Sequence, residues 1–207
     1  MQHIERSEAK KTSLVIFVDV ETQNFFSDPF SDVPLGQGDL KVSFVGVYDP
    51  DTDEFMSFWE KDTKKLEDVL VGADRVVGYN SWAFDYGVLS RYMHVDLWTL
   101  PSLDLMVAMK KAVGFRPKLD DLARANGLGE KIGKGADAIE YWQNGELDKL
   151  EEYCLEDVKL TYEVWRVGDK NRRLTYYAKS GFPRETRINW QDGFLERVDT
   201  SVQGVLL

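Results

Sequence analysis

Apolar residues in the first half of the chain fall into short runs separated by polar turns. The run from Leu14 to Val18 is continuous and mostly β-branched or aromatic, which predicts a buried central strand. The turn Asp49-Pro50-Asp51 separates two further runs and predicts an antiparallel pair. The expected strands are Leu14 to Val18, Lys41 to Tyr48, Glu54 to Trp59, Arg75 to Asn80 and, at a sheet edge, Ser102 to Leu105.

Apolar residues in the second half recur mainly at helical spacing. In the segment from Glu146 to Asn171 they recur at intervals of three and four and so share one helix face. The residues of this face are Leu147, Leu150, Cys154, Val158, Thr161 and Trp165. Other helices are expected at Thr63 to Gly72, with Thr63 as N-cap, and at Phe84 to Met93, Leu105 to Val113, Leu119 to Asn126 and Ala136 to Gln143. Thr175 to Ala178 and Arg187 to Trp190 predict a late hairpin.

The order of these elements predicts one main domain. Three strands followed by alternating strands and helices indicate an α/β fold, with a mixed central sheet of three antiparallel strands plus parallel strands, flanked by helices. We expect a polar N-terminal segment at residues 1–13, the domain at residues 14–168, and a basic C-terminal appendage at residues 169–207 that contains the hairpin.

Cysteine content and hydropathy set the expected compartment. Cys154 is the only cysteine, which excludes an intrachain disulfide and indicates a reducing environment. No run approaches the roughly 18 apolar residues of a membrane span, and the first residues lack the apolar core of a signal peptide. We therefore expect a cytoplasmic protein without a membrane partner.

Charge is distributed unevenly along the chain. The 26 basic and 36 acidic residues give a net charge of −10, which argues against a generic nucleic-acid binder. The segment from Val164 to Trp190 nevertheless carries seven basic and two acidic residues, a local balance of +5, so the rest of the chain sums to −15. This asymmetry predicts either a separate anion-binding face or an ordinary solvated basic surface.

Carboxylates at the end of the first strand suggest a metal site. Asp19 and Glu21 are two residues apart, so strand geometry directs both side chains to the same face. Converging carboxylates are costly unless a cation lies between them, and hard ions such as Mg²⁺ or Mn²⁺ prefer oxygen ligands. An Asp-x-Glu pair also arises easily by chance, so its place on a buried strand carries the argument.

Two later groups bear the same kind of chemistry. Asp85 lies near the start of a helix that follows a buried strand, where the helix dipole alone would also favour an acid. Tyr153 and Asp157 are four residues apart on one face of the long helix and are therefore neighbours. Tyr92 and Asp96 have the same spacing, so the order along the chain, rather than the pair itself, favours the later one.

These groups together resemble a known family. The segments Asp19-Val20-Glu21-Thr22, Asn80 to Asp85, and Tyr153 to Asp157 resemble, in order, the three motifs of DnaQ-like 3′→5′ exonucleases of the ribonuclease H-like superfamily. The tyrosine in the third motif corresponds to the DEDDy branch, because Glu152 stands where the other branch has histidine. Within that branch, Asn80 to Asp85 looks like the Asn-Gly-x-x-Phe-Asp form of family B polymerase proofreading domains, with Ser81 in place of glycine.

The resemblance implies a ribonuclease H-like fold and phosphodiester hydrolysis with two divalent ions, Mg²⁺ or Mn²⁺. It implies that Asp19 binds both ions, that Glu21 and Asp157 complete the first ion site, and that Asp85 supports the second. It also implies that Tyr153 orients the attacking water.

Substrate contacts are expected around these motifs. The expected substrate-binding residues are Thr22, Asn80, Trp82, Phe84, Arg172 and Arg173, with Phe25 and Phe26 as further stacking residues. Trp82 is expected to be the most exposed of the six tryptophans. A core position for Phe84 and Phe26 is an equal alternative.

The expected substrate is a nucleic acid with a 3′ end, single-stranded rather than duplex. A polymerase, helicase or other replication or repair protein is a partner class that the sequence does not distinguish. Two other functions stay open. One is hydrolysis of short oligonucleotides or nucleotides on the same fold, which the net charge of −10 suits. The other is a non-catalytic nucleic-acid-binding module. The presence of all four metal-ligand acids and the tyrosine argues against it.

Overall fold

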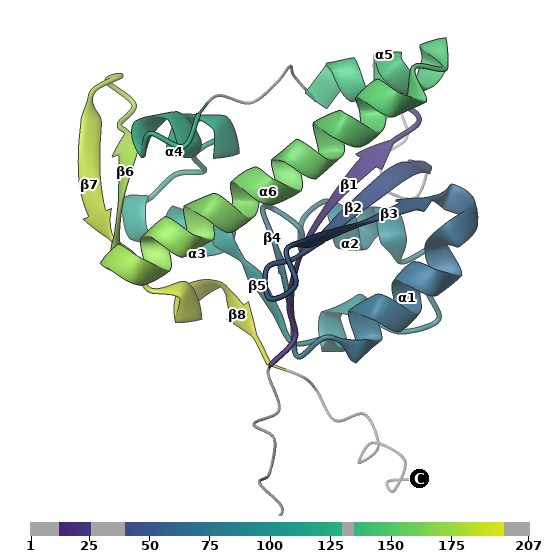
Figure 1. Ribbon diagram of the computed structural model, residues 1–207. Helices are drawn as coiled ribbons and strands as arrows, with labels where there is room; N and C mark the ends of the chain where they lie inside the picture. The colour runs from purple at the N-terminus through teal and green to yellow at the C-terminus, as the bar shows by residue number, and fades with distance from the viewer. Residues whose placement is uncertain (1–12, 26–39, 130–134, 197–207) are drawn as a thin grey trace, which may run out of the picture.

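The computed structural model describes residues 13–25, 40–129 and 135–196. Its centre is a six-stranded sheet in the order β3-β2-β1-β4-β5-β8 (Figure 1). The strands are β1 (Val15–Thr22), β2 (Val42–Asp49), β3 (Glu54–Trp59), β4 (Arg75–Gly78), β5 (Ser102–Asp104) and β8 (Phe194–Leu195). The β3-β2-β1 strands are antiparallel, β4 and β5 continue parallel to β1, and β8 is antiparallel to β5. The expected α/β class with a mixed central sheet is confirmed.

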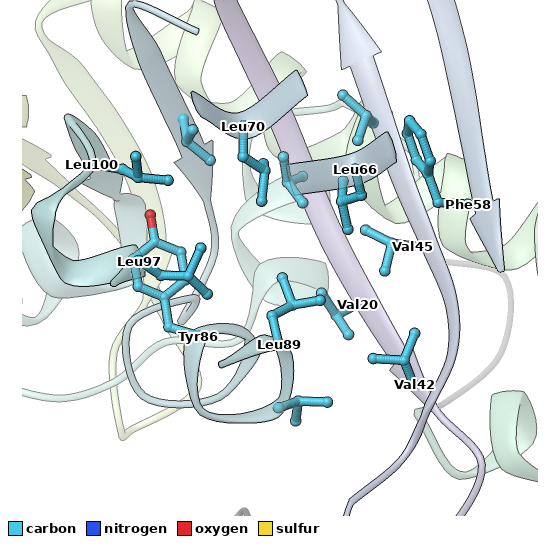
Figure 2. Close-up of a cluster of buried hydrophobic side chains, with 14 of the residues drawn as sticks. Val20, Val42, Val45, Phe58, Leu66, Leu70, Tyr86, Leu89, Leu97 and Leu100 are labelled. Atoms are coloured by element: carbon cyan, nitrogen blue, oxygen red, sulfur yellow. The ribbon is translucent and has the colours of Figure 1, made fainter. Parts of the chain in front are cut away.

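Helices cover both faces of this sheet. They are α1 (Thr63–Gly72), α2 (Asp85–Leu89), α3 (Leu105–Val113), α4 (Leu119–Ala125), α5 (Gly135–Asn144) and α6 (Leu147–Asn171). One apolar cluster joins β1 and β2 to α1 and α2, and Figure 2 shows Val20, Leu66 and Leu89 within it. A second cluster joins Phe17 on the other face of β1 to α3, α4 and α6. Because both faces are covered, all eight residues of β2 are buried.

Alternation along β1 determines where its carboxylates point. Ile16, Val18 and Val20 belong to the cluster under α1 and α2, whereas Phe17 packs on the α6 side. The two-residue period of a strand therefore turns Asp19 and Glu21 toward α6. Figure 1 shows α6 crossing this face of the sheet from end to end.

Small residues allow α6 to lie close to its neighbours. Gly46 pairs with Asp19 in the sheet, and a Cβ atom there would lie 3.0 Å from Cγ2 of Val158 and 3.2 Å from Sγ of Cys154. At the other end, a Cβ atom on Gly168 would lie 2.4 Å from the indole of Trp190. Gly46 therefore lets α6 lie close to the sheet, and Gly168 lets it lie close to Trp190 in the chain that follows the hairpin.

The chain after α6 forms a hairpin and then returns to the sheet. Strands β6 (Arg173–Tyr177) and β7 (Pro183–Arg187) pair in a separate two-stranded sheet beside α4 (Figure 1). After the short 3-10 helix η4 (Trp190–Gly193), β8 pairs with β5. The prediction that β5 is an edge strand was therefore wrong. The boundary at residue 168 stays a prediction, although β8 belongs to the central sheet.

Other element ends differ from the expectations for local reasons. Thr63 is the first residue of α1 and not its N-cap, since its hydroxyl donates to the Glu60 carbonyl of the preceding 3-10 turn at 3.0 Å. Helix α2 ends at Leu89 rather than Met93, because the chain turns there with Tyr92 N–H bonded to the Leu89 carbonyl. Among the described residues, none of the helices combines the length and apolar character needed to span a membrane.

Candidate active site

A cavity of about 320 Å³ opens at the carboxyl end of β1, between the loop after β4 and the helices α5 and α6. Its lining includes all five of the residues predicted to be catalytic: Asp19, Glu21, Asp85, Tyr153 and Asp157. Three separate parts of the chain supply them, namely β1, the start of α2 and the middle of α6. The sheet order explains the convergence, because β1 and β4 are parallel neighbours whose carboxyl ends meet at one edge.

Cys154 packs directly behind the β1 carboxylates. Its Sγ donates to the backbone carbonyl of Asp19 at 3.6 Å and to the Asp19 carboxylate at 3.8 Å. Burial and the nearby charges of Asp19, Glu21 and Asp157 raise the pKa of the Cys154 thiol. The thiol therefore stays protonated. It donates to Asp19 and so holds this residue in place.

Asp85 enters the cavity from a tightly turned loop. Asn80 has a φ of 66°, and its carbonyl accepts from the backbone N–H groups of Ala83 and Phe84, which turns the chain into α2. Asp85 is only 4% exposed. Burial raises the pKa of its carboxyl well above the ordinary range, and the charges of Asp19 and Asp104 raise this pKa further.

Tyr153 and Asp157 reach the cavity from α6. Both are buried, at 2% and 4% exposure, and they lie one helical turn apart. Burial, followed by the charges of Asp157 and Glu21, raises the pKa of Tyr153, so its phenol is protonated at neutral pH. The Tyr141 ring of α5 lies 6.5 Å from the Tyr153 ring in an edge-on contact and limits its movement.

The donor set fits divalent cations. All four acids line one cavity, and Oδ2 of Asp85 is buried without a hydrogen-bond partner among the described residues. An unpartnered buried carboxylate oxygen beside other acids is costly, and a hard cation would relieve both the charge repulsion and the missing contact. Asp19, Glu21 and Cys154 have potential ligand atoms within 4.8 Å of one another, but oxygen-preferring ions would use the carboxylates and not the protonated sulfur.

Asp104 is a functional candidate that the sequence analysis missed. Its buried carboxylate accepts from the backbone N–H groups of Asn80 at 3.0 Å and Trp82 at 3.1 Å. It also caps α3 through Met106 N–H at 2.9 Å and Val107 N–H at 3.2 Å. Burial raises the pKa of Asp104, and these four backbone bonds partly offset the effect. The only sequence signal was an acid just before a helix, which usually indicates no more than an N-cap.

The predicted substrate-binding residues separate into three groups. Thr22, Asn80 and Phe84 line the cavity, as does Phe25, while Phe26 lies outside the described residues. Trp82 is not among the lining residues.

The expected exposure of Trp82 was wrong. Its indole N–H donates to Ser102 Oγ at 3.1 Å and its ring packs against the α1 and α2 core, so it is only partly exposed. Trp98 is the tryptophan with the large exposed surface, at 42%. Trp82 therefore anchors the loop from inside.

Arg172 and Arg173 lie away from the cavity. They stand at the end of α6 and the start of β6, about 22 Å along the helix axis from Asp157. Arg172 pairs with Asp169 at 3.0 Å, and Arg173 pairs with Glu185 at 3.2 Å. Their predicted contact with substrate stays a prediction.

Comparisons with known proteins point to one kind of domain. A family model described as a predicted 3′-5′ exonuclease related to the exonuclease domain of PolB matches residues 90–175. This range includes Tyr153 and Asp157 of the cavity, but not Asp19, Glu21 or Asp85. No curated protein matches the sequence.

A solved structure is similar over most of the chain. It is the family B DNA polymerase from the hyperthermophilic archaeon Pyrobaculum calidifontis, with a TM-score of 0.57 and 21% sequence identity. The similarity covers 79% of this chain and 25% of the polymerase, so the chain spans about a quarter of that protein's length. This similarity confirms the expected ribonuclease H-like fold.

Proposed function

We propose that the protein is a metal-dependent 3′→5′ exonuclease of the DEDDy type, which hydrolyses phosphodiester bonds of DNA or RNA from the 3′ end. The convergence of four acids and one tyrosine from β1, α2 and α6 in a single cavity carries the proposal. The family model for a predicted exonuclease supports the same reaction class over residues 90–175.

Each of the cavity residues has a separate role in this proposal. Asp19, Glu21 and Asp157 would hold one divalent ion and Asp19 with Asp85 a second, either Mg²⁺ or Mn²⁺. When bound, such ions lower the pKa of the attacking water and neutralise charge on the leaving 3′ oxygen. The protonated phenol of Tyr153 holds the attacking water in line by hydrogen bonding.

Residues beside the acids would hold the terminal nucleotide. Phe25 and Phe84 line the cavity, where Phe25, at 53% exposure, would offer a ring face on which any base stacks, while Phe84 also packs against the apolar cluster of α1 and α2. Thr22 and Asn80 supply polar groups at the same wall. Stacking does not depend on the base, so this wall suits stepwise removal of successive nucleotides.

Two alternative functions differ from the proposed exonuclease in which substrates they would cleave. A hydrolase of short oligonucleotides on the same fold would cleave a dinucleotide as well as a long strand. A non-catalytic binding module would cleave neither. The similarity to a family B DNA polymerase favours, as part of the proposal, a polymerase-associated role. The proposed cytoplasmic location rests on the single cysteine of the sequence.

The test is cleavage of 5′-labelled single strands, duplexes, RNA and dinucleotides with Mg²⁺, Mn²⁺ or EDTA. We expect a ladder of products shortened from the 3′ end that disappears with EDTA and in Asp19→Ala. Tyr153→Phe removes only the phenolic hydroxyl and should lower kcat about 100-fold with little change in KM. Glu152→Ala removes an exposed acid from the same helix and should retain full activity. Absence of cleavage of every substrate would refute the proposal.

A further inference from the structure

The turn of the β6–β7 hairpin and the loop before α4 form one basic and aromatic surface, here called the hairpin platform. Its cations and rings are Phe115, Arg116, Tyr176, Tyr177, Lys179, Phe182 and Arg184. The acid Asp121, which lines the same hollow, is paired with Arg124 at 2.6 Å. We infer that the hairpin platform binds the single-stranded nucleic acid that lies upstream of the terminal nucleotide held in the cavity. This inference rests on the proposed function, since it concerns the substrate of that same cavity.

The platform is directly connected to the cavity wall. The guanidinium of Arg116 donates to the side-chain oxygen of Asn80, which lines the cavity. Tyr79, another lining residue, donates its hydroxyl to the Pro117 carbonyl at 2.6 Å. The loop before α4 is thus fixed beside the site by two contacts. A strand that leaves the cavity on this side meets Arg116 and then Phe115.

Aromatic rings on the platform are arranged for stacking. Phe115 lies 6.0 Å from Tyr176 of β6, and Nζ of Lys179 lies 6.0 Å from the centre of the Phe115 ring. Phe182, at the hairpin turn, is 71% exposed, the largest exposure among the large hydrophobic side chains that the structure describes. An exposed phenylalanine between cations is unfavourable in water but provides a stacking face for a base.

The platform cations are available to phosphates. Lys179 and Arg184 are both exposed and form no ion pair with any described residue. Arg172 and Arg173, at the base of the same hairpin, differ because each is paired with an acid. In a chain with a net charge of −10, exposed cations without carboxylate partners beside exposed rings favour a polyanion with bases over an acidic protein.

The hairpin is held in position before any ligand binds. The side chain of Asn126 in the turn after α4 donates to the Thr175 carbonyl at 2.8 Å and accepts from Thr175 N–H at 3.0 Å. The Arg124 guanidinium covers the Tyr177 ring at 5.2 Å. Figure 1 shows α4 beside β6 of the hairpin. Such a fixed surface loses little conformational entropy when a strand binds.

The platform is tested by measuring binding and cleavage of a long single strand and cleavage of a dinucleotide. The variants are Phe182→Ala and Lys179→Ala/Arg184→Ala. The control is Lys61→Ala/Lys64→Ala, at the start of α1, which removes the same charge from exposed lysines that form no ion pair with a described residue. Binding of a fluorescent single strand of about twelve nucleotides, as DNA and as RNA, is measured by anisotropy in EDTA. Cleavage of that strand and of a dinucleotide is measured with Mn²⁺.

We expect each platform variant to weaken binding of the long strand about fivefold or more, and to raise its KM, while dinucleotide cleavage and the control stay unchanged. The double variant should also reduce the slope of log affinity against log salt by roughly 1.4. Unchanged affinity, or equal losses on long and short substrates, would overturn the inference. If the wild type cleaves nothing but still binds the strand through the platform, only the proposed activity fails. Equal effects on DNA and RNA would indicate recognition of phosphate and base alone.

Discussion

The carboxylate of Asp104 accepts a hydrogen bond from the backbone N–H of Trp82 at 3.1 Å. This bond ties the end of β5 to the loop that leads into Asp85, and a second bond from Asn80 N–H reinforces it. Asp104 does not line the cavity. It therefore acts through the loop and positions Asp85, which we propose as a ligand of the second ion.

Asp104→Asn separates this positioning role from helix capping. The oxygen kept by asparagine can still accept from Asn80, Met106 and Val107, which share Oδ1, but an amide NH₂ would replace the Oδ2 acceptor of Trp82 N–H. We expect a loss of about 2 kcal/mol in the free energy of unfolding, and a fall in kcat larger than the change in KM. Ser102→Ala removes the indole bond of Trp82 and the Ser102 contact with the Tyr86 hydroxyl but keeps the Asp104 bonds, so it should have the smaller effect on kcat. Wild-type kcat in Asp104→Asn would contradict the role.

Asp85 should control both metal binding and stability of the metal-free protein. Burial, and then the nearby charge of Asp19, disfavour the ionised form of this carboxyl in the folded protein, so we expect Asp85→Asn to raise Tm in EDTA. Each kcal/mol corresponds to about 2–4 °C for a chain of this size. Added Mn²⁺ should raise the Tm of the wild type by more than that of the variant, which keeps the three carboxylates proposed to hold the first ion. A matched experiment with Glu152→Ala should reproduce the wild-type shift, and an equal Mn²⁺ shift in Asp85→Asn would exclude this residue as a ligand.

Arg172 and Arg173 test whether cations that are already paired with an acid contribute less to substrate binding than unpaired cations do. Each guanidinium is paired with an acid on the same helix or hairpin, which reduces its attraction for phosphate. We expect Arg172→Ala/Arg173→Ala to raise KM for long strands less than Lys179→Ala/Arg184→Ala does. Steady-state cleavage of long and short strands measures the difference. Equal losses on both substrates would show that these arginines are not distal phosphate contacts.

Glu67 should make folding sensitive to acid. Its carboxylate is hydrogen-bonded to the His94 ring nitrogen at 3.0 Å and accepts from the backbone N–H groups of His94 and Val95. These bonds lower the pKa of Glu67, and the bond to the His94 side chain has the largest effect. A lowered pKa in the folded state means that the contribution is present above the ordinary pKa of 4.5 and is lost as the pH falls below it.

The measurement for Glu67 is urea unfolding from pH 7 down to about pH 3 for wild type and Glu67→Gln. The wild type should be more stable at neutral pH, and the difference should disappear in acid. Asp68→Asn, an exposed neighbour on α1, should follow the wild-type curve. A difference that persists unchanged at low pH would show that the charge of Glu67 is not responsible.

Local periodicity determined much of the fold and the chemistry of the site. The two-residue period of β1 was enough to predict that Asp19 and Glu21 share a face, and the structure places both on the cavity wall. The helical period likewise predicted α3 and α6 to within a residue at each end. These features depend on residues close in sequence, so they are readable without the fold.

Spacing by itself did not determine which pairs take part in the site. Tyr92 and Asp96 repeat the spacing of Tyr153 and Asp157, but the Tyr92 hydroxyl donates to Glu60 at 2.8 Å and Asp96 caps the 3-10 helix η3 (Leu97–Thr99). The order of the motifs along the chain already favoured the later pair, and the neighbouring elements show what the earlier pair does instead.

Tertiary structure alone decided how the separate motifs are joined. The positioning role of Asp104, the inward anchoring of Trp82 and the return of β8 to the sheet all depend on contacts between residues far apart in sequence. Residues close together along the chain establish which faces carry acids and which carry apolar residues. Long-range backbone pairing and burial decided which of those faces meet, because a hydrogen bond across 22 residues leaves no local pattern.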